Sequence, residues 1–80
     1  MDRKRFAVLW IQTDPSWKQV FSCDLPEDFR VVSPLIDNVD WSAAQVVADG
    51  ANSIESRRRR GQWAAIFEQE WADCNLPQLQ

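Results

Sequence analysis

Four consecutive arginines, Arg57 to Arg60, are the residues of this chain whose type and spacing point most directly to chemistry. Guanidinium groups bind carboxylate and phosphate oxygens through paired, charge-assisted hydrogen bonds. The run therefore predicts contact with an acidic protein surface or with the phosphates of DNA or RNA. A third interpretation is a solvated helix end, paired in part with Glu55 or with the acidic middle of the chain. Successive helical residues point around most of the circumference, so all of them cannot contact one duplex.

Two further residues are candidates for partner binding. Trp17 follows the turn signal Thr13-Asp14-Pro15-Ser16, where a ring can stay half exposed, and tryptophan is enriched at the centres of interfaces. Arg30 follows an acidic loop and would extend such a patch. The basic residues 3–5 would join the patch if the N-terminus lies near the arginine run. The predicted partner-binding residues are Arg57, Arg58, Arg59, Arg60, Trp17 and Arg30.

The composition argues against catalysis and against metal or cofactor binding. The chain has no histidine, which removes the commonest general base and the commonest metal ligand. The acids around Asn38 lack the alternation and the closing glutamate of an EF-hand loop. No phosphate-binding glycine loop and no CxxC motif is present. We therefore expect no catalytic residue, no metal, no cofactor and no enzymatic activity.

Charge and cysteine usage indicate the kind of surface and the compartment. The net charge is −3, and Arg30 is the single basic residue between Asp24 and Glu55. This pattern favours a patterned surface over a uniformly basic nucleic-acid binder. Cys23 and Cys74 lack zinc-site spacing, and no signal peptide or membrane-length apolar run is visible. We expect a cytoplasmic protein with buried, reduced thiols, with a disulfide between these cysteines as the alternative.

The first half of the chain predicts strands. Residues 5–12 are rich in β-favouring types and apolar on both faces, which predicts an interior strand. The turn signal then predicts a hairpin with a second strand over residues 17–23. A short third strand over residues 29–32 is expected to end at Ser33-Pro34, and residues 37–40 are expected to be a loop. The better core face of the hairpin would hold Phe6, Val8, Trp10, Trp17 and Phe21.

The second half predicts helices. Ser42 with Gln45 matches a capping box and Trp41 with Val46 matches a hydrophobic staple, so a helix is expected to begin at Ala43. If one continuous helix carried the apolar stripes before and after Gly61, the two stripes would lie on opposite sides of it. Glycine commonly ends helices, so a break is expected at Gly61. We predict helices over residues 43–60 and 62–73, with a candidate break at Asp49-Gly50, and a tail over residues 75–80.

Strands followed by helices predict one small α+β domain over residues 1–80. Its sheet is an antiparallel β-hairpin or a three-stranded sheet, packed against two C-terminal helices. The strands together span residues 5–32. The aromatic face of the sheet is expected to pack against Val47, Ile54, Trp63, Phe67 and Trp71.

Two segments, VLWIQTDPSWKQVFSCDLPEDFRVV and EWADCNLPQL, resemble the MbtH-type adaptors of peptide synthetases. The SLWP and PxGW signatures of that family are absent, and a longer stretch of chain separates the two segments. No site residue is carried over from that family.

Five tryptophans in 80 residues favour a binding protein, because tryptophan anchors small cores and interface centres. The leading hypothesis is a small protein-binding regulator, an inhibitor or adaptor of a larger cytoplasmic protein or complex, of bacterial or phage origin. One alternative is a nucleic-acid-binding protein that uses Arg57 to Arg60. Another is a structural or self-assembling subunit, which would form a homo-oligomer. No membrane partner is expected.

Overall fold

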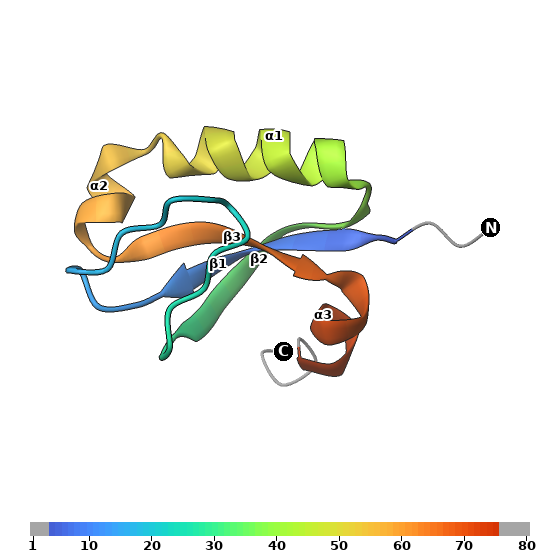
Figure 1. Ribbon diagram of the computed structural model, residues 1–80, viewed down its shortest axis with the longest axis horizontal. Helices are drawn as coiled ribbons and strands as arrows, with labels where there is room; N and C mark the ends of the chain where they lie inside the picture. Colours follow the sequence, from blue (N-terminus) through green and yellow to red (C-terminus); the bar gives the residue numbers. More distant parts are fainter. Residues whose placement is uncertain (1–3, 76–80) are drawn as a thin grey trace.

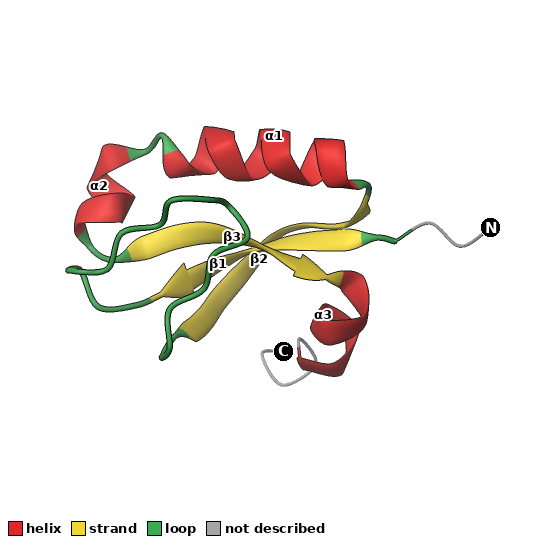
Figure 2. Cartoon of the chain, in the orientation of Figure 1, coloured by secondary structure: helices red, strands yellow, loops and turns green. Residues whose placement is uncertain are grey.

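A computed structural model describes residues 4–75 as an antiparallel three-stranded sheet with helices packed on it (Figure 1, Figure 2). The sheet order is β2-β1-β3, which confirms the predicted α+β class. Several predicted boundaries differ from those of the structure. The elements in chain order are β1 (Phe6–Gln12), β2 (Arg30–Val39), α1 (Trp41–Asn52), α2 (Glu55–Arg59), β3 (Gln62–Glu68) and α3 (Gln69–Asn75).

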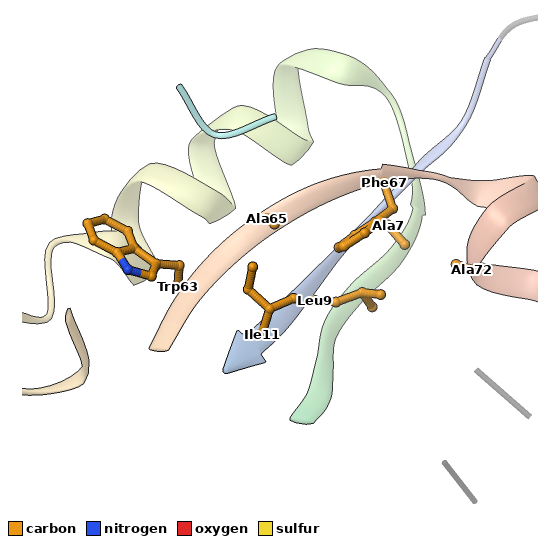
Figure 3. Packing of buried hydrophobic residues seen from close by; sticks show 7 residues of the cluster. All are labelled: Ala7, Leu9, Ile11, Trp63, Ala65, Phe67 and Ala72. Atoms are coloured by element: carbon orange, nitrogen blue, oxygen red, sulfur yellow. The ribbon is translucent and has the colours of Figure 1, made fainter. Parts of the chain in front are cut away.

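β1 is the central strand, which confirms the interior strand predicted over residues 5–12. All residues from Ala7 to Ile11 are buried, because strands pair with both edges and both faces are covered. On one face, Leu9 and Ile11 pack with β3 residues and with Ala72 of α3 (Figure 3). On the other face, Val8 and its neighbours pack against α1. We call these the α3 face and the α1 face.

The hairpin predicted after β1 is wrong, because residues 17–23 form an irregular segment. The turn itself forms, and the backbone N–H of Trp17 donates to the carbonyl oxygen of Asp14 at 2.9 Å. Both edges of β1 are already occupied by β2 and β3. The chain instead passes the outer edge of β3, where the carbonyl of Ser22 accepts from Ile66 N–H at 3.0 Å. The predicted face that joined Trp17 to β1 as a cross-strand partner therefore does not exist.

β2 runs well beyond the strand predicted over residues 29–32 and includes Pro34 and most of the loop predicted over residues 37–40. Proline is tolerated here because β2 is an edge strand, so its missing N–H does not interrupt a central ladder. The pairing with β1 shifts register at three places, and Asn38 has a positive φ of 56°. Bulges and proline on an edge disfavour pairing with a strand of another molecule.

α1 begins two residues before the predicted start at Ala43. Its N-cap is Asp40, whose Oδ1 accepts a backbone N–H of the first turn at 2.8 Å, so the predicted capping box at Ser42 is wrong. The hydrophobic staple is wrong too. Trp41 packs edge-on against the Phe6 ring with centroids 5.1 Å apart, and Val46 is exposed.

The helix predicted over residues 43–60 is in fact two helices, because α1 ends at Asn52 and α2 begins at Glu55. The candidate break at Gly50 lies within α1 instead. The predicted core residue Ile54 lies in the connection and is exposed. Val47, by contrast, packs against the α1-face cluster as expected.

The helix predicted over residues 62–73 is wrong, because residues 62–68 form β3 and only Gln69–Asn75 is helical. Every residue from Trp63 to Phe67 is apolar and buried. An apolar run of this length is compatible with a buried helix or with a strand that is buried on both faces. Pairing with β1 decides for the strand. Trp71 of α3 then stacks on Phe67 with centroids 4.5 Å apart. The predicted tail over residues 75–80 lies almost wholly outside the described residues.

The outer edge of β3 is closed by side chains from elsewhere in the chain. Asn52, at the end of α1, accepts from Ala64 N–H at 2.7 Å and donates to the Ala64 carbonyl at 3.0 Å. It also donates to the side chain of Gln19 at 2.7 Å. These bonds tie the end of α1, the segment after the turn and β3 together.

Candidate functional site

α2 carries the arginine run at the end of the sheet where β1 ends and β3 begins (Figure 1). Helices this short are marginal in isolation, so tertiary contacts must hold this one. Gln12 Nε2 donates to the carbonyl of Arg60 at 2.6 Å, and Thr13 N–H donates to the carbonyl of Gly61 at 2.9 Å. Glu55 in the first turn and the arginines in the last turn suit the helix dipole.

The side chains of Arg57 and Arg58 lie on opposite sides of the sheet. The Arg57 guanidinium carbon lies 4.3 Å from the ring centroid of Trp10, which belongs to the α1-face cluster. Arg58 is half-buried and lines a cleft with Trp63, which belongs to the α3-face cluster. Arg57 and Arg58 therefore contact tryptophans that belong to different faces of the sheet.

The remaining arginines of the run are exposed. Arg59 Nη2 lies 2.7 Å from Glu55 Oε1. Pairs this exposed contribute at most about 1 kcal/mol, so this bond holds the Arg59 side chain only weakly. Arg30 opens β2 opposite Gln12, whose side chain bonds to the backbone of Arg60, so Arg30 lies at the same end of the sheet.

The basic N-terminus does not join this group. Lys4 and Arg5 precede β1 and lie at the opposite end of the sheet. Lys4 Nζ pairs with Glu68 Oε1 at 2.9 Å, and this hydrogen bond raises the pKa of Lys4 above its ordinary value. Arg5 hydrogen-bonds to the side chain and carbonyl of Asn38. The predicted joint patch is wrong for these residues, and Arg3 lies outside the described part of the chain.

Trp17, predicted as an interface anchor, is half-buried and packs within the chain. Its ring meets that of Trp63 edge to face, with centroids 5.9 Å apart and an interplanar angle of 86°. The residues that follow it are the exposed ones. Val20 and Phe21 are 76% and 67% exposed, and Lys18 lines the same cleft as Arg58.

Sequence reasoning missed Lys18, Val20 and Phe21 because WKQVFSC has the composition of a strand. Because β2 and β3 occupy both edges of β1, these residues have no place beside the central strand. No local signal in the sequence marks them as exposed.

The cleft lies between α2, the segment after the turn and the start of β3. Its volume is about 280 Å³, and it is lined by Lys18, Glu55, Arg58, Arg59 and Trp63. This volume lies near the lower end of the roughly 300–1,000 Å³ of ligand pockets for small molecules. Its lining carries three cationic side chains and one carboxylate.

The cysteines are exposed and free, so the expectation of buried thiols is wrong. Within residues 4–75, no group of three or more metal-ligating side chains gathers. No helix among these residues has the length and apolar character needed to cross a membrane.

Comparison with protein-family models, with curated proteins and with solved structures finds no match to this chain. The resemblance to MbtH-type adaptors gains no support from these comparisons.

Proposed function

We propose that this chain is a small non-enzymatic protein-binding regulator that engages a larger cytoplasmic partner. Its contact region is the α2 surface, which consists of Lys18, Val20, Phe21, Arg58 and Arg59. The observation that carries the proposal is that two apolar side chains, Val20 and Phe21, are 76% and 67% exposed and lie two and three residues after Lys18, which lines a basic cleft.

Single exposed apolar residues are common on protein surfaces, but this pair is held in place. Phe21 N–H donates to Asp24 Oδ2 at 2.8 Å, and Asp24 N–H donates back to the Phe21 carbonyl at 2.8 Å. The next carbonyl, that of Ser22, is bonded to β3. A fixed backbone reduces the entropy lost on binding, and interfaces are enriched in aromatic residues and arginine.

Two features favour a protein partner over the alternatives. The net charge is −3, and Arg57 is engaged with Trp10, so the basic residues do not form a track for a phosphate backbone. The proline and the register shifts of β2 disfavour self-assembly through the exposed edge of the sheet.

The exposed free thiols of Cys23 and Cys74 suit a reducing compartment such as the cytoplasm.

The test compares two valines of nearly equal exposure. Val20 lies on the α2 surface, and Val46, 72% exposed, lies on α1. The immobilised full chain is incubated with nuclease-treated host lysate, and the captured protein is identified and its affinity measured. Val20→Ser should weaken binding by about tenfold, since burying a valine contributes roughly 1.5 kcal/mol or more. Val46→Ser should leave the affinity unchanged.

Equal affinities for the two serine variants would contradict the proposed surface. Recovery of a partner only without nuclease would assign the chain to nucleic acid instead. A molecular mass in sedimentation that rises with concentration, with no foreign protein captured, would favour the self-assembling subunit.

A further inference from the structure

We infer that the cleft beside α2 receives a carboxylate side chain of the partner protein. This inference rests on the proposed function and adds the chemistry that the partner must present. It is carried by two observations on residues that line this cleft. They are the excess of positive charge, and the buried donor nitrogens of Arg58 and Trp63, which have no acceptor among residues 4–75.

The charge of the cleft is positive on balance. Lys18, Arg58 and Arg59 line it, against the single carboxylate of Glu55. Glu55 is already bonded to Arg59 at 2.7 Å, and Arg58 forms no ion pair with a carboxylate among residues 4–75. An anion entering the cleft therefore meets at least one guanidinium that has no carboxylate of its own.

The unsatisfied donors belong to the lining itself. Trp63 is 6% exposed, and its Nε1 has no acceptor among residues 4–75. Arg58 Nε is likewise shielded from solvent and without an acceptor in this part of the chain. Indole and guanidinium nitrogens donate only, so the group that satisfies them must be an acceptor. Both nitrogens are shielded from solvent, so a ligand reaches them only when the side chains that cover them move aside.

The size and surroundings of the cleft select a protein carboxylate. At about 280 Å³ the cleft has room for one side chain of a partner protein. Val20 and Phe21, exposed two and three residues after Lys18, would bury against an apolar counterpart, which a free inorganic anion does not have. An aspartate or glutamate on a partly apolar protein surface supplies both features.

The experiment follows the Trp63 indole N–H and the Arg58 Nε–H by nitrogen-15 NMR of the full chain. The probes are an N-acetylated hexaglutamate peptide, the matched hexaglutamine peptide and inorganic phosphate. We expect hexaglutamate to move both resonances in a saturable way and hexaglutamine to leave them in place. Phosphate should bind no more tightly than hexaglutamate.

Matched variants distinguish binding in the cleft from general attraction to the positive charge at this end of the molecule. Arg58→Gln should weaken hexaglutamate binding by about tenfold, because a charge-assisted bond is lost. Arg60→Gln removes the same charge from an exposed residue outside the cleft lining and should change the affinity by less than about twofold. Arg58→Lys keeps the charge but not the forked geometry, so it should also weaken binding. Unfolding midpoints confirm that each variant is folded.

Three results would overturn the inference. They are resonances that stay in place with hexaglutamate, equal losses for Arg58→Gln and Arg60→Gln, and phosphate binding tighter than peptide binding. Each of these results leaves the proposed function intact if Val20→Ser still weakens capture of the partner protein. Conversely, hexaglutamate binding with full partner capture by Val20→Ser would refute the proposed surface and keep the carboxylate site.

Discussion

Gly61→Ala tests the joint that holds α2 against the end of the sheet. Gly61 connects α2 to β3 with φ of 75°, in the left-handed region. A Cβ at this position would collide with the carbonyl oxygen of Thr13 and would lie 3.1 Å from the backbone nitrogen of Pro15. Both neighbours are backbone atoms, so no side-chain rotation relieves the contact.

The expected loss of stability has two parts. The left-handed conformation is less favourable for alanine by about 1–2 kcal/mol. Moving the turn away from the new Cβ also strains the hydrogen bond from Thr13 N–H to the Gly61 carbonyl, 2.9 Å long, which contributes about 1 kcal/mol. The sum is about 2–3 kcal/mol, a large share of the roughly 4–12 kcal/mol expected for a chain of this size. The melting temperature should fall by about 10–20 °C.

Urea unfolding followed by tryptophan fluorescence measures the change, and Gly50→Ala is the matched control. Gly50 lies inside α1, and a Cβ there meets nothing within 4 Å. Alanine should stabilise this position by about 0.5–1 kcal/mol. Stability shifts in the same direction for the two variants, or a Gly61→Ala protein within about 0.5 kcal/mol of the parent, would contradict a steric role for this joint.

Asn52→Ala removes the side chain that closes the outer edge of β3 and should lower the free energy of unfolding by about 1–3 kcal/mol in urea titrations; an unchanged midpoint would show that the edge does not need it. Asp40→Ala should lower the free energy of unfolding by about 0.5–2 kcal/mol, whereas Ser42→Ala should lower it by less than about 0.5 kcal/mol. If thermal melts show the larger loss for Ser42→Ala, the N-cap is Ser42 and not Asp40. Hydrogen bonds from the backbone and side chain of Ser16 hold the pKa of Asp14 below its ordinary 3.8. Its contribution is therefore present above pH 3.8 and is lost as pH falls through the lower folded-state pKa, so Asp14→Asn should flatten the acid side of the stability profile; an unaltered slope would contradict this.

The candidate site was only partly predictable from sequence. The arginine run, its place at a helix end and the divergent directions of its side chains follow from helix geometry and residue type. The cleft does not, because Lys18 and Trp63 reach it from segments far apart in the chain. Trp63 also belonged to a predicted helix, where its side chain would have faced a different set of neighbours.

The sequence by itself determined the local features. The central strand β1, the turn after it, the helical character of residues following Asp40 and the break at Gly61 depend on hydrophobicity, turn chemistry and glycine conformation, all of which act between near neighbours. The α+β class follows from the same local preferences.

Only the tertiary structure decided which strands pair. β1 takes its partners from residues 30–39 and 62–68, and this leaves the strand-like segment 17–23 without a sheet. Pairing energies depend on contacts distant in sequence, and an all-apolar run such as Trp63 to Phe67 suits a helix or a buried strand equally well. Completing the two-sided core therefore selected β3, placed Val20 and Phe21 in solvent and formed the cleft beside α2.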